Sequence, residues 1–187
     1  MAFLFERDQE MDGVILITPF YTSDTRGDFT KYYEKAIFRE NGIIFDVTEE
    51  FVTTSVNHVI RGLHFQTKNP QAKLVTVIEG AIFDVVVDLR LSSPTFGYWK
   101  SYNLTAEKRA SIYVPKGFAH GFLTFGDINV VLYKCDAPYH QQSDGGIVWH
   151  DSDLDIKWPI GLESPIVSEK DMALQKFCEF QATFGGF

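Results

Sequence analysis

Short apolar runs separated by turn residues recur along the chain, and this pattern predicts a protein built mainly from β-strands. In residues 81–89 every second position is apolar, which is the period-two pattern of a strand with one strongly apolar face. Glu79 and Gly80 are expected to form the turn that precedes this strand. The predicted strands are 13–18, 43–47, 59–66, 72–78, 81–89, 111–114, 121–125, 129–135 and 147–149.

Helical signals are confined to two segments near the edges of this pattern. Residues 30–39 are predicted to form a short helix, and residues 168–180 a clearer one that Ser168 caps. Many short strands with little helix favour an all-β sandwich or barrel, and a jelly roll of the cupin type fits best. An immunoglobulin-like sandwich fits less well, because the chain lacks the paired cysteines around a tryptophan.

Composition and charge exclude several classes of protein. The 187 residues suit one domain spanning 1–187 with a substantial core, and the net charge of −8 argues against nucleic-acid binding. Cys135 and Cys178 are too few for a disulfide scaffold and are expected to be reduced. No apolar run reaches transmembrane length, and the N-terminus becomes charged too early for a signal peptide. We therefore expect a cytoplasmic protein without a membrane partner.

The segment R-G-L-H-F-Q at 61–66, followed by A-K-L-V at 72–75, carries the most informative chemistry. His64 can remove a proton from carbon, and Lys73 can hold the negative charge that results. Both residues have structural alternatives, since a strand histidine is often structural and a lysine at a strand end often extends its amine to solvent. The pattern alone leaves these alternatives open.

The run P-K-G-F-A-H at 115–120 has the P-x-G-x-x-H form of the second cupin motif. In metal-binding cupins this histidine joins an H-x-H pair and a glutamate. Here Gln66 replaces the second histidine of that pair, and His58 lies six residues before His64, which is not the usual spacing. Because a transition metal needs three or four well-placed ligands, we expect no metal site.

Two further side chains have both catalytic and structural interpretations. The Tyr133 hydroxyl could act as a general acid if it faces a cavity, or could belong to a core aromatic at the rim. Asp171 could orient a histidine, or could form a capping box with Ser168 at the start of the C-terminal helix.

These segments together resemble the nucleotide-sugar 3,5-epimerase family. The resemblance rests on R-G-L-H-F-Q, A-K-L-V, D-x-R-x-x-S-P-T-F-G at 88–97, P-x-G-F-A-H-G-F, L-Y-K and S-x-K-D, and extends from about residue 24 to residue 171. It implies that His64 is the base, Asp171 its orienting partner, Lys73 the group that stabilises the enolate, and Tyr133 the acid on the opposite face. The substrate's C4 ketone accepts the electrons, so the resemblance implies no cofactor.

The resemblance also implies a substrate-binding set and an assembly. Arg26 and Arg61 correspond to arginines that engage the nucleotide diphosphate, for which the guanidinium fork is suited. The further substrate-pocket positions are Gln66, His120, Tyr139 and Lys170. The family is dimeric with exchanged N-terminal strands, so a homodimer is expected here.

One conflict and several departures leave questions open. Strict alternation places Arg61 on the strand face opposite His64, unless Gly62 twists or bulges the strand. The family's Q-D-N-like run is replaced by residues 49–53, a glutamate by Lys31, and the acidic residue of the phosphate-side loop appears as Asp144. The nucleotide therefore stays open among dTDP, CDP, UDP and GDP. Alternative functions are a single-centre epimerase, a 3,4-ketoisomerase, and a non-catalytic cupin that binds sugar or metal.

Overall fold

The computed structural model describes residues 2–161 and 164–187, and these fold into antiparallel β-structure with short helices at the edges. The helical segments are α1 (Lys35–Glu40), the 3₁₀ turn η1 (Gln141–Ser143), α2 (Glu169–Met172) and α3 (Phe177–Phe184). In the described ranges no helix is long and apolar enough to cross a membrane. The strands are β1 (Leu4–Arg7), β2 (Ile15–Thr18), β3 (Phe20–Asp24), β4 (Gly27–Lys31), β5 (Glu49–Ser55), β6 (Ile60–Gln66), β7 (Lys73–Asp88), β8 (Trp99–Thr105), β9 (Ser111–Val114), β10 (Phe118–Cys135) and β11 (Asp144–Gly146).

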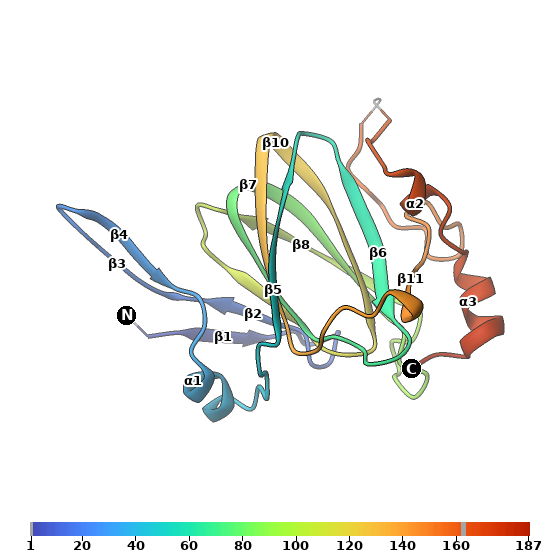
Figure 1. Cartoon of the computed structure of the whole chain (residues 1–187), viewed down its shortest axis with the longest axis horizontal. Helices are drawn as coiled ribbons and strands as arrows, with labels where there is room; N and C mark the ends of the chain where they lie inside the picture. Colours follow the sequence, from blue (N-terminus) through green and yellow to red (C-terminus); the bar gives the residue numbers. More distant parts are fainter. Residues whose placement is uncertain (1, 162–163) are drawn as a thin grey trace.

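Two long strands, β7 and β10, organise the molecule (Figure 1). They pair antiparallel along most of their length, and each takes a different outer partner in each half. β7 pairs with β9 near its start and with β8 near its end, while β10 pairs with β6 and then with β5. The sheet therefore wraps around a central core, which confirms the predicted all-β jelly roll of the cupin type.

The long strands correct one part of the sequence prediction. No turn separates 72–78 from 81–89, because β7 runs through Gly80, whose φ of 80° lets the strand bend. The opposite segments 121–125 and 129–135 likewise belong to the single strand β10, with an irregular register between Phe125 and Val130. The Asn129 side chain accepts a hydrogen bond from the backbone N–H of Ala81 at 3.1 Å and joins the two bends. The bends preserve backbone pairing where the sequence suggested breaks.

Two predicted strands were wrong. Residues 43–47 are irregular, and Ile43 and Phe45 instead bury their side chains in a small cluster with Phe38 of α1. Residues 147–149 do not form a strand, because Ile147 makes only an isolated bridge with Gln175, and β11 lies directly before it. In both places burial explains the apolar run without a sheet ladder.

Both predicted helices differ from the structure. The first is only α1, because Thr30 and Lys31 pair with β3 across the β3–β4 hairpin. The second is broken into α2 and α3, because Gln175 between them bridges Ile147. The predicted cap is confirmed, since the Ser168 hydroxyl accepts a hydrogen bond from the backbone N–H of Asp171 at 3.1 Å.

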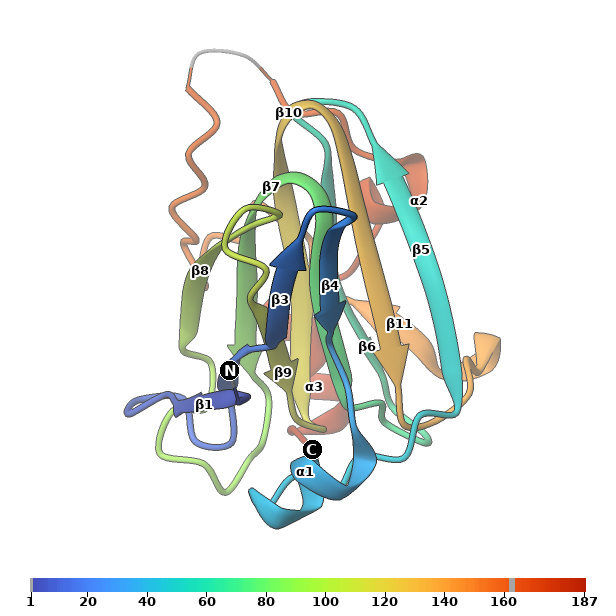
Figure 2. The ribbon, with the colours of Figure 1, turned by 90° about the vertical axis from the view of Figure 1, so that its left-hand side faces the viewer.

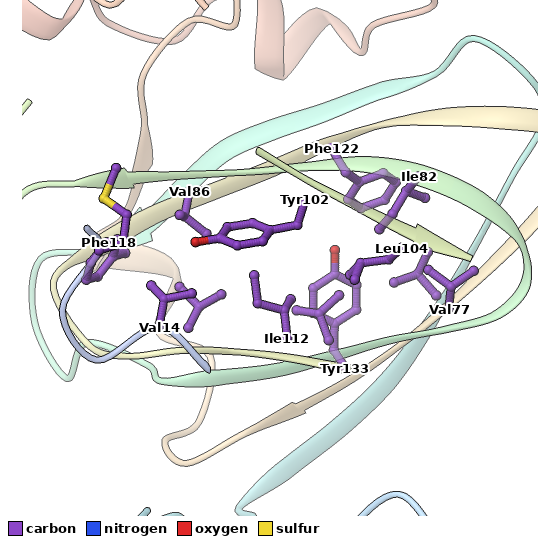
Figure 3. Close-up of a cluster of buried hydrophobic side chains, with 14 residues drawn as sticks. Val14, Val77, Ile82, Val86, Tyr102, Leu104, Ile112, Phe118, Phe122 and Tyr133 are labelled. Carbon is purple, nitrogen blue, oxygen red and sulfur yellow. The ribbon is translucent and has the colours of Figure 1, made fainter. Parts of the chain in front are cut away.

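The strand β7 is buried on both of its faces, whereas the pattern indicated one strongly apolar face. Its even-numbered side chains Ile82 and Val86 point into the barrel, where they pack with Phe122 and Tyr133 (Figure 3). Beyond Gly80 the odd-numbered residues of β7 pack against the C-terminal segment in a second core cluster, whereas before Gly80 the odd-numbered Val75 and Val77 belong to the inward cluster. Asp84 lies on the inward face and is fully buried, so the barrel interior contains a carboxyl group.

The N-terminal hairpin β3–β4 extends outward from the barrel and touches it through Arg109, which pairs with Asp28 and lies over the Tyr21 ring. It forms a separate two-stranded sheet that pairs with no other strand in the part of the chain described. It projects from the side of the barrel opposite α2 and α3 (Figures 1 and 2). Phe29 of this hairpin is 54% exposed, which is unusual for a large apolar side chain in a sheet.

Candidate active site

Two glycines allow the backbones of β6 and β10 to approach closely. Gly62 has a φ of +108°, and a Cβ at this position would lie 2.7 Å from the Cα of Gly121 and from the carbonyl oxygen of His120. A Cβ on Gly121 would in turn lie 2.7 Å from the Arg61 carbonyl oxygen. Only glycine fits at this crossing, which gives a physical reason for the G in each of the two motifs.

The same crossing sets the direction of the β6 side chains. His64 pairs with His120 and Arg61 with Phe122, so β6 contains an extra residue relative to β10, which is a bulge. Because of this bulge, Arg61 turns toward β5, where its Nε donates to the Ser55 hydroxyl at 3.0 Å. Arg61 and His64 therefore share the inward face of β6, as expected if Gly62 bulges the strand.

His64 forms a close pair with Asp171 of α2. Its Nε2 lies 2.8 Å from Asp171 Oδ1, and Asp171 Oδ2 accepts from the backbone N–H of Gly62 at 3.1 Å. Burial would raise the pKa of Asp171, but the His64 hydrogen bond and charge, the Gly62 N–H and the Lys170 charge outweigh it and lower this pKa. An ionised Asp171 holds the proton on Nε2 and leaves Nδ1 as the basic nitrogen.

Asp171 takes part in the helix cap through its backbone and contacts His64 through its side chain. Its backbone N–H binds the Ser168 hydroxyl, whereas its carboxylate is directed to His64 and Gly62. The short helix α2 thus delivers the carboxylate to β6.

Lys73 begins β7 and lies directly opposite Cys135 of β10. Burial lowers the pKa of its amine, and the charges of Cys135, Asp144 and Asp136 offset this only in part. Lys73 makes no ion pair with any carboxylate of the described residues. A buried amine without a fixed partner is suited to meet a negative charge that appears only during a reaction.

His64 and Lys73 border the same hollow of about 160 Å³. The hollow lies at the end of the barrel where β6, β7 and the 137–144 loop meet. Five predicted site residues line it, which brings together positions far apart in the sequence. These are His64, Gln66, Lys73, Tyr139 and Lys170.

Tyr133 lies deeper, inside the barrel, with its hydroxyl turned toward the interior (Figure 3). Burial raises its pKa well above the ordinary value, and the Asp84 charge adds to this while Arg61 opposes it. The His120 ring meets it edge-on, with the ring centroids 5.9 Å apart. His120 Nε2 is in turn 2.7 Å from Asp84 Oδ2, so a second histidine–carboxylate pair lies behind the tyrosine. Tyr133 is therefore a protonated phenol at neutral pH.

Polar contacts across the mouth of the hollow connect the 137–144 loop with α2. Tyr139 donates its hydroxyl hydrogen to Asp144 Oδ2 at 3.0 Å, and Lys170 forms an ion pair with the same carboxylate. Gln66 lines the hollow, but its amide nitrogen donates to the carbonyl oxygen of Asn69 at 2.9 Å, and its amide oxygen accepts from the His140 N–H at 2.7 Å. Gln66 thereby holds the loop that carries Tyr139.

Arg26 is the predicted site residue that lies elsewhere. It occupies the turn of the β3–β4 hairpin, pairs with Asp24, and its side chain is 88% exposed. The hollow that it borders is formed only by hairpin residues. Within one chain, the structure does not bring Arg26 to the hollow that contains His64.

Three residues near the site were not predicted as site residues. Phe51 stacks on Tyr133, Glu49 accepts from the Tyr139 backbone N–H at 2.6 Å, and Asp84 binds His120. A charged residue within the apolar alternation of 81–89 was an available signal for Asp84. Nothing local marks Phe51, because its neighbour Tyr133 is known only once β5 is paired with β10.

Among the residues described, no group of three or more His, Cys, Asp or Glu side chains is arranged to hold a metal ion.

The fold places the chain in the class of cupin-type jelly rolls. The sequence pattern of the dTDP-4-dehydrorhamnose 3,5-epimerase family matches residues 8–179. The dTDP-4-dehydrorhamnose 3,5-epimerase of Methanothermobacter thermautotrophicus is 47% identical over 162 residues, covering 86% of this chain and 88% of that protein.

Solved structures agree with this match. The dTDP-6-deoxy-D-glucose-3,5-epimerase of Legionella pneumophila, in complex with dTDP-4-keto-L-rhamnose, has a TM-score of 0.89 and 37% identity, with coverage of 93% and 92%. The dTDP-4-dehydrorhamnose 3,5-epimerase of Bacillus anthracis, with TDP and PPi bound, has a TM-score of 0.89 and 40% identity, with coverage of 94% and 99%. The chain belongs to the dTDP-4-dehydrorhamnose 3,5-epimerase family and is an isomerase.

Proposed function

We propose that this protein inverts C3 and C5 of dTDP-4-dehydro-6-deoxyglucose by proton transfer. The observation that carries the proposal is the His64–Asp171 pair, 2.8 Å apart, bordering one hollow with the buried Lys73. Both carbons flank the C4 ketone, so one set of groups can act on each in turn. The ketone accepts the electron pair, and the chemistry therefore requires no cofactor.

The first step is deprotonation by His64. Nδ1 takes the proton from the carbon while Asp171 stabilises the imidazolium that forms. The electron pair of the broken C–H bond moves to the C4 oxygen, where the Lys73 cation stabilises the enolate. Lys73 contributes more to the enolate than to the neutral ketone, because its charge has no fixed counterion in this buried position.

The second step is reprotonation by Tyr133. A buried phenol with a raised pKa stays protonated until an enolate is formed, so it serves as an acid. Delivery from the ring face opposite His64 inverts the carbon and leaves a tyrosinate, which solvent then reprotonates. A 3,4-ketoisomerase would have no use for an acid on that face, and this favours the epimerase.

Binding of the nucleotide involves a second set of residues. Arg61, Tyr139, Lys170 and His120 are the proposed contacts to the substrate within the chain, and arginine suits the diphosphate. We further infer a homodimer in which the β3–β4 hairpin of one protomer crosses to its partner. The hairpin pairs with no strand of its own barrel among the described residues and touches it through Arg109, which contacts Asp28 and Tyr21. This lack of strand pairing and the 54% exposure of Phe29 support the inference, which brings Arg26 to the partner's substrate.

Solvent exchange followed by NMR tests this function. In D₂O, the wild-type protein should incorporate deuterium at C3 and C5 of dTDP-4-dehydro-6-deoxyglucose and yield the doubly inverted product. His64→Ala should lose exchange at both carbons by about 1,000-fold or more, because the substitution removes the proposed base. The same measurement with UDP-, GDP- and CDP-linked sugars tests the nucleotide.

Several outcomes would contradict the proposal. Exchange at one carbon alone would indicate a single-centre epimerase. Full activity of His64→Ala would exclude His64 as the base. The absence of exchange with all four nucleotide sugars would favour a non-catalytic cupin.

A further inference from the structure

The Tyr133 side chain is held by ring contacts rather than by a hydrogen bond. In the described part of the chain its hydroxyl has no hydrogen-bond partner. Its orientation therefore depends on the rings that pack against it. These are Phe51, stacked at a centroid distance of 4.8 Å and an interplanar angle of 12°, and His120, edge-on at 5.9 Å.

The two ring contacts of Tyr133 differ in how firmly the neighbouring ring is held. His120 is buried and bonded to Asp84, so its ring is fixed from behind. Phe51 lies on β5, an edge strand whose one partner among the described residues is β10, and it is 38% exposed. The register places Phe51 directly opposite Tyr133, and directly opposed side chains share one face of the sheet.

Phe51 also connects Tyr133 with the hollow. It lines the hollow together with His64 and Lys73, whereas Tyr133 is not among the residues that line it. Phe51 thus has one contact with the proposed acid and another with the space that the sugar would occupy. A flat ring at this point fixes the plane of Tyr133, because parallel stacking restricts rotation of both rings.

We propose that Phe51 is a positioning residue that sets the direction of the Tyr133 hydroxyl. It thereby decides how often reprotonation of the enolate inverts the sugar carbon. The inference rests on the proposed function. Once His64 has taken the proton, the enolate has two fates. His64 returns a proton to the same face, which exchanges hydrogen without inversion, or Tyr133 delivers one to the opposite face, which inverts the carbon. Misalignment of Tyr133 affects only the second fate.

The ratio of these two fates can be measured with Phe51→Leu. In D₂O, deuterium in recovered substrate reports return by His64, and inverted product reports delivery by Tyr133. Phe51→Leu keeps an apolar side chain but removes the flat ring. We expect exchange within about threefold of wild type and inversion lowered at least tenfold. Phe51→Tyr, which restores a stacking ring, should return the ratio to within about twofold of wild type.

Controls separate this inference from a general loss of structure. Val52→Ala alters the next residue of β5, which is 54% exposed, and should leave the ratio unchanged. If Phe51→Leu does not fold, Phe51→Met is measured in its place. Equal losses of exchange and inversion, or an unchanged ratio, would overturn the positioning role. Exchange that persists in His64→Ala would instead contradict the proposed function, so the two failures are distinguishable.

Discussion

At the scale of single residues, the site depends on charges held in places where water is scarce. Asp171 is buried and ionised because His64 and the Gly62 N–H bind its two oxygens. Lys73 lacks such compensation, and burial lowers its pKa. A folded-state pKa below the unfolded one means that the lysine cation opposes folding at neutral pH. In the proposed mechanism the same charge stabilises the enolate, so Lys73 would link activity to reduced stability.

Lys73→Met should therefore lower kcat by about 100-fold or more while raising the free energy of unfolding at pH 7 by about 1–2 kcal/mol. Between the lowered folded pKa and the unfolded pKa, the unfolded state binds more protons, so wild-type stability rises with pH. The stability advantage of the variant should shrink as pH rises through this window. On the alkaline side, wild-type activity should decline at a pH below the pKa of an ordinary lysine, because Lys73 loses its proton there. Denaturant unfolding and kcat measured across pH check both effects.

Lys134→Met is the matched control for this prediction. Lys134 follows Tyr133 on β10, points to the other face and pairs with Glu50. Its removal should neither stabilise the fold nor reduce kcat substantially. A Lys73→Met protein that is less stable than wild type at pH 7 would contradict the explanation.

At the scale of elements, a single bulge in β6 assembles the inward face of the site. Ile60 and Leu63, three positions apart, both pack in the outer core cluster, which simple alternation does not allow. The extra residue at the Gly62 crossing turns Arg61 and His64 inward together. This one bulge, which the two glycines permit, therefore places a guanidinium and an imidazole on the same face of β6.

Gly62→Ala should disrupt this arrangement. The new methyl group would lie 2.7 Å from backbone atoms of β10, which cannot move without disturbing the ladder with β7. We expect a loss of about 3 kcal/mol or more in unfolding free energy, and a fall in kcat even where the protein is fully folded. Thermal unfolding and steady-state kinetics measure the two effects.

Gly126→Ala provides the comparison. Gly126 also has a positive φ, of +98°, but no atom of the described residues lies within 4 Å of a Cβ there. It should show only the cost of the backbone conformation, about 1 kcal/mol, with normal kcat. Equal effects of the two substitutions would mean that the close approach of β6 and β10 is unimportant.

At the scale of the whole molecule, the barrel and the N-terminal hairpin are separate parts of one proposed site. The barrel supplies His64 and Lys73, whereas Arg26 sits at the tip of a hairpin that projects from it (Figure 1). A site completed by a partner follows from the inferred dimer. It predicts that two differently damaged chains can restore each other.

Heterodimers of Arg26→Ala and His64→Ala chains should recover activity. In such a dimer the Arg26→Ala chain keeps His64 and receives Arg26 from its partner, so one of the two sites is intact. We expect about half the wild-type activity per dimer, well above either parent measured at low substrate concentration. The chains are coexpressed with two affinity tags and purified by both. Activity no higher than that of the Arg26→Ala parent would contradict the exchange of hairpins.

The sequence by itself determined the strand-rich architecture, the family and the residue types of the site. The period-two alternation and the motifs around His64, Lys73 and His120 are local. Such patterns can be recognised in the sequence without knowing which strands pair. Strand ends and helix lengths were less accurate, because backbone pairing carried β7 through Gly80 and the Ile147–Gln175 bridge divided the last helix. These outcomes depend on contacts between distant segments.

Only the tertiary structure decided how the chemical groups meet. It turned Arg61 inward, directed the Asp171 carboxylate away from the cap and toward His64, and placed Phe51 against Tyr133. It also kept Arg26 away from its own chain's hollow. The physical reason is that each relation joins residues on different elements, whose register and bulges arise from packing rather than from any local preference.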